Sequence, residues 1–247
     1  MRSNDIGVLK PYKKEYDYSY TSGAYATIEM IRARPEAVRA VYIHSDYRDK
    51  IAMENLCCGN NISVIYDDRA FVRINQKENS YVLGMFDKYP GTLEKDKPHI
   101  VLVNPGDMGN LGTVIRIAAG FHICNLGIVT PAADVFGPKT IRASMGALFR
   151  INCQQFHSFE QYQGMYGRHR IFPFLLHAET VLNPENCPKA DLFSLVFGNE
   201  AAGLDESKYK RIGTGIKIPQ SALVDSLNLS VAVGIGAFMF ATKNGLV

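Results

Sequence analysis

The chain has 247 residues, of which 47% are hydrophobic, and a formal net charge of +3. This length allows one large domain or two ordinary ones, and the mild basicity is compatible with a nucleic-acid partner. Five cysteines without a C-x-x-C spacing argue against a disulfide framework and a zinc site, so no metal is expected. The N-terminus lacks a signal-peptide core and no stretch has the length of a membrane span, so we expect a cytoplasmic protein.

The first part of the chain alternates between helical and strand patterns. Residues 1–16 are a polar lead-in, and residues 17–87 predict a small α/β domain. It opens with a loop or helix entry at Asp17–Gly23. Helices are then expected at Ala24–Ala33 and Tyr47–Cys57, and strands at Val38–Ile43 and Ile62–Tyr66. Short apolar pieces at Phe71–Ile74 and Tyr81–Phe86 surround a polar insert at Asn75–Ser80.

Aromatic and basic side chains are frequent in this first domain. They are Tyr20, Tyr25, Arg32, Arg34, Arg39, His44 and Arg48. Such residues either form a face that binds RNA or lie on an ordinary solvated surface. The sequence leaves both alternatives open.

A charged segment with Pro90 and Gly91 predicts a linker over residues 88–97, followed by a second domain over residues 98–247. The domain begins with a strand at His99–Val103, a helix at Leu111–Phe121 and a strand at Asn125–Val129, which is typical of a parallel sheet. The intervening glycines are spaced G-x-x-G-x-x-G instead of G-x-G-x-x-G. A dinucleotide-binding fold is therefore disfavoured.

Basic residues follow in this second domain. Arg116 lies among apolar helix residues and needs an anionic partner, which is either a buried salt bridge or a phosphate. Lys139 and Arg142 flank a turn of small residues at Ala143–Ala147, which either faces RNA or packs tightly. Strands are then expected at Arg150–Gln155 and Arg170–His177, with a helix at Ser158–Gly167 between them.

Two polar groups near the C-terminus adjoin apolar elements. A short strand at Leu195–Phe197 ends in Gly198-Asn199-Glu200, and α/β proteins bind ligands at such strand ends. Glu200 either orients a ligand group or begins the next helix. A strand at Ile216–Pro219 then leads into a helix that reaches Phe240 and is apolar on every side, which predicts burial in the core. Ser226-Leu227-Asn228 in its first turn either caps the helix or forms a pocket floor.

Three features stand in order along the chain: Asn110 with Arg116, Gly198-Asn199-Glu200, and Ser226-Leu227-Asn228. This ordered set resembles the three motifs of the SpoU family of ribose 2′-O-methyltransferases, in the SPOUT superfamily. The resemblance implies an α/β fold with a parallel sheet and a C-terminal trefoil knot, preceded by a small α/β substrate-binding domain. It also implies S-adenosylmethionine as cofactor, tRNA or rRNA as substrate, and a homodimer with the site at the interface.

The resemblance further implies roles for individual residues. The positions that match the family's catalytic residues are Asn110, Arg116, Glu200, Ser226 and Asn228. The positions that match its cofactor-binding loops are Phe197, Gly198, Asn199, Gly203, Ile218, Pro219, Gln220, Ser226, Leu227 and Asn228. We assign Arg116 to the target phosphate and hydroxyl, because a guanidinium is a very poor base.

In this mechanism Glu200 and Asn110 hold Arg116 and the substrate in place, while Ser226 and Asn228 order the knot loop and the ribose. Positioning of the hydroxyl behind the methyl group is expected to contribute most to the rate. The alternative function is that of a non-catalytic RNA-binding or assembly factor that retains the methyltransferase fold.

Overall fold

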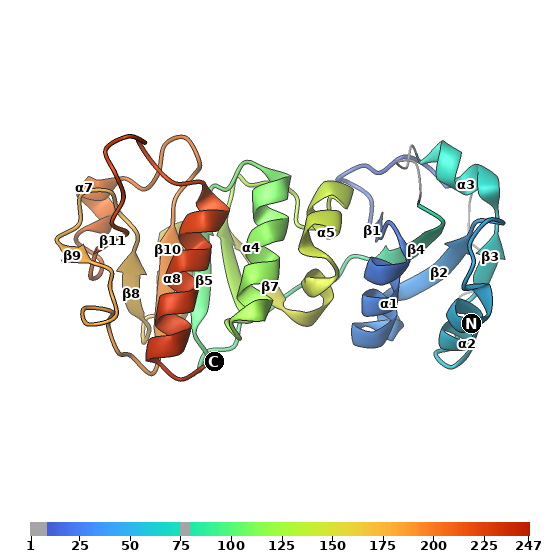
Figure 1. Ribbon diagram of the computed structural model, residues 1–247, viewed down its shortest axis with the longest axis horizontal. Helices are drawn as coiled ribbons and strands as arrows, with labels where there is room; N and C mark the ends of the chain where they lie inside the picture. Colours follow the sequence, from blue (N-terminus) through green and yellow to red (C-terminus); the bar gives the residue numbers. More distant parts are fainter. Residues whose placement is uncertain (1–8, 75–79) are drawn as a thin grey trace.

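The computed structural model describes residues 9–74 and 80–247 and contains two main sheets, one formed before residue 90 and one after it (Figure 1). The first sheet has the strand order β1-β4-β2-β3, in which β2 and β3 are parallel and the other pairs antiparallel. Its strands are β1 (Tyr18–Tyr20), β2 (Val38–Ile43), β3 (Val64–Tyr66) and β4 (Val82–Asp87). The helices beside it are α1 (Ala24–Ala33), η1 (Pro35–Ala37), α2 (Lys50–Cys58) and α3 (Asp68–Arg73).

One prediction for this region is wrong. The segment Asp17–Gly23 contains strand β1, because pairing with β4 buries Tyr20 to 2% exposure. Most of the apolar piece at Phe71–Ile74 belongs to helix α3, which Asp67 caps by accepting a hydrogen bond from the Arg69 N–H at 3.0 Å. The polar insert predicted at Asn75–Ser80 lies outside the described residues except for Ser80.

The second sheet has five strands in the order β7-β6-β5-β10-β8, and every pairing is parallel, as predicted. Its strands are β5 (His99–Val103), β6 (Asn125–Val129), β7 (Asn152–Phe156), β8 (Arg170–Pro173) and β10 (Phe193–Phe197). A separate pair joins β9 (Thr180–Val181) to β11 (Ile216–Lys217). After β7, at one edge of the sheet, the chain crosses to β8 at the opposite edge and then adds β10 between β8 and β5, so β5 and β10, which are far apart in sequence, are neighbours.

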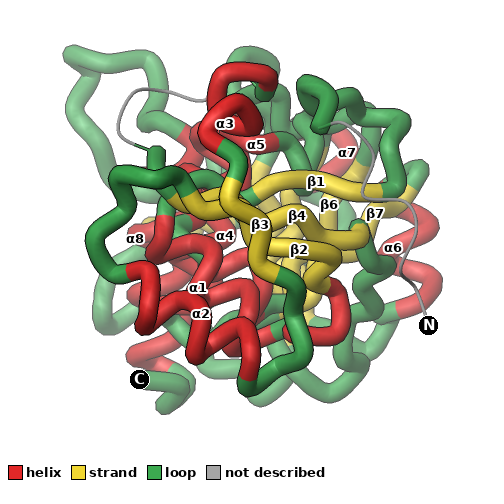
Figure 2. Tube along the Cα trace, turned by 90° about the vertical axis from the view of Figure 1, so that its right-hand side faces the viewer, coloured by secondary structure: helices red, strands yellow, loops and turns green. Residues whose placement is uncertain are grey.

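Helices cover both faces of this sheet (Figures 1 and 2). The helices are α4 (Met108–Gly120), α5 (Pro138–Ser144), η2 (Ala147–Arg150), α6 (Phe159–Met165), α7 (Glu206–Tyr209) and α8 (Leu229–Lys243). Helices α4 and α8 share one core with Ile100 and Leu102 of β5, whereas α6 packs in another core with Val101 of the same strand. This alternation along β5 is that of a strand buried on both faces. None of the helices in the described parts of the chain is long and apolar enough to cross a membrane.

Helix α8 is only partly buried, so the prediction that all its sides lie in the core is wrong for the single chain. Val233, Ala237 and Phe240 are fully buried, but Val231 is 49% exposed and Phe238 is 51% exposed. The Phe238 ring lies 5.9 Å from the ring of Phe121, measured between centroids. The sheet covers one side of the helix, and an apolar stripe remains in contact with solvent.

The segment predicted as a linker is packed along the second sheet. Leu93 is buried, and its N–H donates to Gln154 Oε1 at 3.0 Å. Gly91 approaches the backbone of Cys153 so closely that an added Cβ would lie 2.0 Å from its carbonyl oxygen. Phe86 of the first sheet contacts Phe149 with ring centroids 5.2 Å apart, and one hydrophobic core continues across both parts.

Candidate active site

Two loops meet where β5 and β10 end. Because the strands are parallel neighbours, their carboxyl ends lie at the same edge of the sheet. The Asn199 side chain joins the loops, since its Nδ2 donates to the Asn104 carbonyl at 2.8 Å. Its Oδ1 accepts from the N–H groups of Ala201 and Ala202 at 2.9 and 3.1 Å. Asn199 therefore fixes both its own turn and the turn after β5.

Glu200 is the centre of a hydrogen-bond network at this edge. Its carboxylate accepts from the backbone N–H groups of Gly106 and Asp107 at 2.9 and 3.1 Å, and from Asn110 Nδ2 at 3.2 Å. Partial burial opposes ionisation, but the hydrogen bonds from Gly106, its own backbone, Asn110 and Asp107 outweigh it. The pKa of Glu200 is therefore held below its ordinary value. At neutral pH the group is an anion whose oxygens are already occupied by donors.

Asn228 connects this network to helix α8. Its Nδ2 donates to Asn110 Oδ1 at 3.0 Å, and its Oδ1 accepts from the Ser230 N–H at 2.9 Å as the cap of α8. One chain of hydrogen bonds thus runs from Glu200 through Asn110 to Asn228. The structure brings together one residue from each of the three motifs, which come from the start of α4, the turn after β10 and the start of α8.

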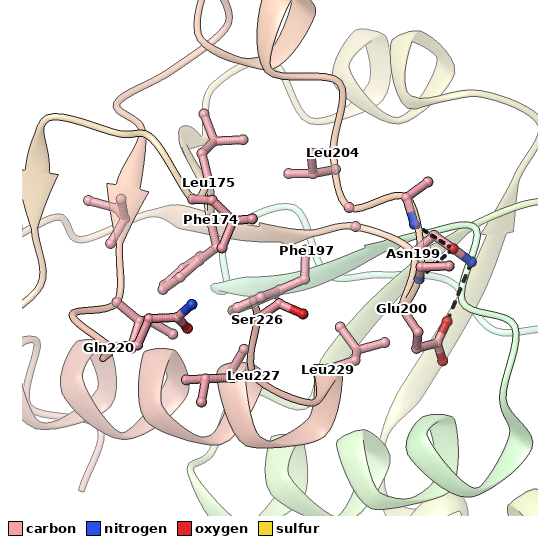
Figure 3. A pocket seen from close by; sticks show the side chains of 18 residues that line it. Phe174, Leu175, Phe197, Asn199, Glu200, Leu204, Gln220, Ser226, Leu227 and Leu229 are labelled. Atoms are coloured by element: carbon pink, nitrogen blue, oxygen red, sulfur yellow. Dashed lines mark hydrogen bonds between the residues drawn. The ribbon is translucent and has the colours of Figure 1, made fainter. Parts of the chain in front are cut away.

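A cavity of about 190 Å³ adjoins this network (Figure 3). Of the residues predicted to bind the cofactor, eight line it: Phe197, Gly198, Asn199, Gly203, Ile218, Gln220, Ser226 and Leu227. Pro219 and Asn228, also predicted, are not among its lining residues. Glu200 lines it as well, so the network forms part of the cavity wall.

The apolar wall of the cavity contains residues that the sequence analysis missed, namely Phe174, Leu175, Leu176, Leu204, Ile216 and Ala232. The rings of Phe174 and Phe197 stack with centroids 4.2 Å apart and an angle of 18° between their planes. Gly236 of α8 makes room for this pair, since an added Cβ would lie 2.6 Å from Phe174 Cζ. Phe174 directly follows β8, so its place after a parallel strand was a usable signal.

The turn after β10 is folded back on itself. An added Cβ at Gly198 would lie 2.1 Å from the carbonyl carbon of Gly203, and Gly203 itself has a φ of +65°. Only glycine tolerates this combination of close approach and left-handed backbone at little cost. The two glycines therefore let the turn present Asn199 and Glu200 side by side at the cavity.

Arg116 does not lie with the other predicted residues. Its side chain is exposed, it does not line the cavity, and no hydrogen bond or ion pair joins its guanidinium to any residue within 9–74 or 80–247. The alternative of a buried salt bridge is therefore wrong. Glu200 and Asn110 hold the start of α4 and Asn228, and they do not hold Arg116 as the sequence-based mechanism required.

The aromatic and basic face predicted for the first domain is not formed as a set. Tyr20 is buried, Arg39 pairs with Asp17 at 2.8 Å, and the Arg34 guanidinium lies 5.0 Å from the centre of the Tyr89 ring. Tyr25 and the Arg32 side chain remain open to solvent, with 59% and 61% exposure. Only part of the predicted face is thus available to a partner.

The site contains the groups that a nucleoside-like ligand needs. Stacked aromatic rings and leucines offer an apolar surface for a flat base, while Gln220, Ser226 and the turn backbone offer polar contacts. Within the described parts of the chain no cluster of three or more His, Cys, Asp or Glu residues is arranged to hold a metal ion.

Known proteins share this fold. The SpoU methyltransferase AviRb from Streptomyces viridochromogenes, solved in complex with the cofactor AdoMet, superposes with a TM-score of 0.80 at 17% identity, covering 92% of this chain and 90% of that one. An AdoMet-bound rRNA methyltransferase from Sinorhizobium meliloti superposes with a TM-score of 0.75 at 22% identity, covering 92% and 87%. At these identities the likeness establishes the fold.

Sequence relatives point to the same group. The chain is 30% identical over 131 residues to the 23S rRNA (guanosine(2553)-2′-O)-methyltransferase RlmP of Bacillus subtilis, covering 52% of each protein. It is 28% identical over 142 residues to an uncharacterized tRNA/rRNA methyltransferase of Synechocystis, covering 55% of this chain and 50% of the relative. The chain thus spans about half the length of these two relatives. The profile of the SpoU rRNA methylase family matches residues 97–238, more than half of the chain. The chain therefore belongs to the SpoU rRNA methylase family.

Proposed function

We propose that this protein transfers a methyl group from S-adenosylmethionine to a ribose 2′-hydroxyl of tRNA or rRNA. The observation that carries the proposal is the hydrogen-bond chain Glu200–Asn110–Asn228 at the wall of the cavity. Family membership supports the reaction class, and the name of the Bacillus subtilis relative supports RNA ribose as the acceptor.

The lining of the cavity fits the proposed cofactor. The Phe174 and Phe197 rings suit an adenine base, and the polar atoms of Gln220 and Ser226 suit its ribose and amino-acid parts. When bound, S-adenosylmethionine supplies a methyl group on a positively charged sulfur, which is already electrophilic. The protein residues therefore have to position the acceptor and need not activate the donor.

In this proposal Glu200 and Asn228 hold the parts of the site in position. The carboxylate of Glu200 fixes the N-terminal end of α4, and Asn228 fixes the N-terminal end of α8 against Asn110. Two helix starts are thus held at one rim of the cavity. Holding reacting groups in alignment is a large contribution to such reactions. The exposed Arg116 is assigned to a phosphate of the RNA, outside the cavity.

The proposed architecture follows the family. Residues 98–247 form the methyltransferase domain, in which the loops Phe197–Gly203, Ile218–Ala222 and Ser226–Leu229 belong to a C-terminal trefoil knot. Residues 17–87 form an RNA substrate-binding domain, and residues 88–97 form the linker. The first of these loops and parts of the other two line the same cavity, which supports this assignment. A cytoplasmic location is part of the proposal, because the RNA substrates are found there.

We also propose a homodimer that covers the exposed stripe of α8. Val231 and Phe238 are each about half exposed, and Phe121 extends the apolar surface beside Phe238. Replacement of Phe238 by glutamate is expected to give monomers in light scattering coupled to size exclusion. Val72→Glu serves as control, since Val72 is 82% exposed on α3. An unchanged dimer in Phe238→Glu, or a monomeric wild type, would disprove this interface.

The function is tested by incubating the purified chain with S-adenosylmethionine labelled in the methyl group and with bulk tRNA or 23S rRNA. Label in 2′-O-methylated nucleosides after nuclease digestion is the expected result. Comparison of 2′-O-methyl sites in cells with and without the gene then identifies the nucleotide. The non-catalytic alternative predicts no binding of S-adenosylmethionine in calorimetry. The cavity and network described above favour the enzyme over that alternative.

A further inference from the structure

Helix α5 connects the site to the first sheet and its helices. At its start, Lys139 Nζ bonds Asp107 Oδ2 at 2.8 Å, and Asp107 is the residue that caps α4 next to Glu200. Just beyond its end, Gly146 contacts α1 so closely that an added Cβ would lie 2.6 Å from Glu29 Cβ. A helix of seven residues is about 10 Å long, so α5 bridges a short distance (Figure 1).

Three arginines surround this bridge on the surface. Arg142, in the last turn of α5, is exposed, and no ion pair or hydrogen bond links its guanidinium to the described part of the chain. Arg32 and Arg150 have side-chain exposures of 61% and 52%. Arg32 pairs with Glu29 at 3.6 Å and Arg150 pairs with it at 2.6 Å, and the Glu29 side chain is only 13% exposed. Two guanidinium groups therefore share the Glu29 carboxylate, and Arg142 adds a third positive charge that has no acidic partner in the described chain.

Exposed side chains with large faces accompany these arginines. Tyr25 is 59% exposed and lies one turn before Glu29 on α1, so both are on one side of that helix. Met145, next to Gly146, is 45% exposed. We call the five residues Tyr25, Arg32, Arg142, Met145 and Arg150 the seam surface. The combination of a free tyrosine ring with guanidinium groups suits a chain of phosphates with unpaired bases.

We propose that the seam surface binds the RNA next to the nucleotide being modified, with phosphates at its arginines and an unpaired base on Tyr25. The proposal rests on the proposed function and names a contact region for its substrate. Charge complementarity selects RNA as the occupant, because Arg32 and Arg150 together pair with one carboxylate, Glu29, and Arg142 pairs with none in the described chain. Because α5 spans the distance to Asp107, an RNA held here also reaches the cavity rim.

Arg142→Ala is the variant that tests this contact, since the exposed side chain has no partner to lose in the described chain. Filter binding with a 23S rRNA transcript and with bulk tRNA measures affinity across a salt series. We expect roughly tenfold weaker binding of the RNA that the wild type methylates. The slope of log affinity against log salt should fall in magnitude by about 0.7–0.9, the value for one lost phosphate contact. KM for RNA should rise while kcat and the affinity for S-adenosylmethionine stay unchanged.

Arg168→Ala is the matched control, because Arg168 is also exposed and lies before β8, at the end of the sheet opposite the cavity. If Arg142→Ala and Arg168→Ala have the same RNA affinity and the same salt slope, the proposal is overturned, and the proposed methyltransferase activity is unaffected. A wild type that binds neither RNA would instead contradict the proposed function itself. Weaker binding to polyglutamate with unchanged binding to RNA would assign the surface to an acidic protein and also overturn the proposal.

Discussion

Replacement of Glu200 by glutamine tests whether the site network stabilises the fold. The carboxylate accepts four hydrogen bonds, at 2.9, 3.1, 3.2 and 3.4 Å, from Gly106, Asp107, Asn110 and Asn199. A glutamine keeps one accepting oxygen and turns its NH2 group toward at least one of these donors. Hydrogen bonds to charged groups contribute about 1.5–3 kcal/mol, but this site is partly solvated. We therefore expect a net loss of about 1–2 kcal/mol in the free energy of unfolding.

Thermal unfolding followed by circular dichroism measures this loss. For a chain of this length, about 1–2 kcal/mol corresponds to a Tm lowered by roughly 3–6 °C at pH 7. Glu179→Gln is the control, because Glu179 is exposed and its carboxylate forms no hydrogen bond or ion pair with the described residues. It should change the free energy of unfolding by less than about 0.5 kcal/mol.

The pH dependence separates charge from shape in the same experiment. Burial opposes ionisation of Glu200, yet its hydrogen bonds lower its folded-state pKa below the ordinary value of 4.5. The stabilisation is therefore complete well above pH 4.5 and is lost as the pH falls through the lower folded-state pKa. The difference in Tm between wild type and Glu200→Gln should shrink in that acidic range. A difference that stays constant from pH 7 to pH 3 would refute the reasoning.

Three further changes probe the site and the core. Asn228→Ala removes the cap of α8 and should lower the free energy of unfolding by about 1 kcal/mol. Asn228→Asp keeps the cap but cannot donate a hydrogen bond to Asn110, so urea unfolding should separate the two variants. Methyl transfer should be lost in both. Gly198→Ala forces the turn open, because its Cβ would lie 2.1 Å from the Gly203 carbonyl carbon. Calorimetry should show at least tenfold weaker binding of S-adenosylmethionine to this variant. Gly164→Ala is the control and should bind normally, because the space around Gly164 is open. Burial lowers the pKa of His99 to about 4 from an ordinary 6.5, so on acidification the unfolded chain takes up a proton before the folded chain does. The free energy of unfolding should therefore fall by roughly 3 kcal/mol between pH 6.5 and pH 4. Urea unfolding that is unchanged over this range would contradict that account.

The order of elements predicted the parallel sheet, and the family resemblance implied that the motifs meet; the geometry of the sheet gives the physical reason for both. Strands joined by a helical crossover run parallel, and their carboxyl ends then share one edge. Asn110, Glu200 and Asn228 all follow strand ends or begin helices, so a correct sheet nearly forces them together. The strands His99–Val103 and Asn125–Val129 have the predicted bounds, because each is a short apolar run between turn residues.

Within one chain, Arg116 lies apart from the other residues of the motifs. Arg116 follows Asn110 by six residues on α4, and at about 100° per residue the two side chains point roughly 120° apart. They cannot both face one cavity on the same chain. This follows from the six-residue spacing, which can be read from the sequence. The motif places both residues in the family's reaction, but helix geometry places them on different surfaces.

Other failures come from packing that local patterns do not encode. Tyr18–Tyr20 reads as a polar aromatic loop until β4 is available to pair with it. Arg39 and Arg34 read as free cations, but distant residues, Asp87 and Tyr89, occupy them. The exposed stripe of α8 is the reverse case, in which residues predicted to be buried are exposed. The apolar sequence of a helix does not show whether the rest of the same chain covers it on every side.

The chemistry of Glu200 limits the mechanisms open to this site. A general base needs a free lone pair and a pKa near the working pH. Glu200 has neither, since four donors, from Gly106, Asp107, Asn110 and Asn199, occupy its oxygens, and its hydrogen bonds hold its pKa low. Its charge instead fixes the backbone of the turn after β5, and through Asn110 it fixes the start of α8. If the reaction is methyl transfer, the carboxylate serves it by setting the positions of two helix starts, and the acceptor proton must leave to a group other than Glu200.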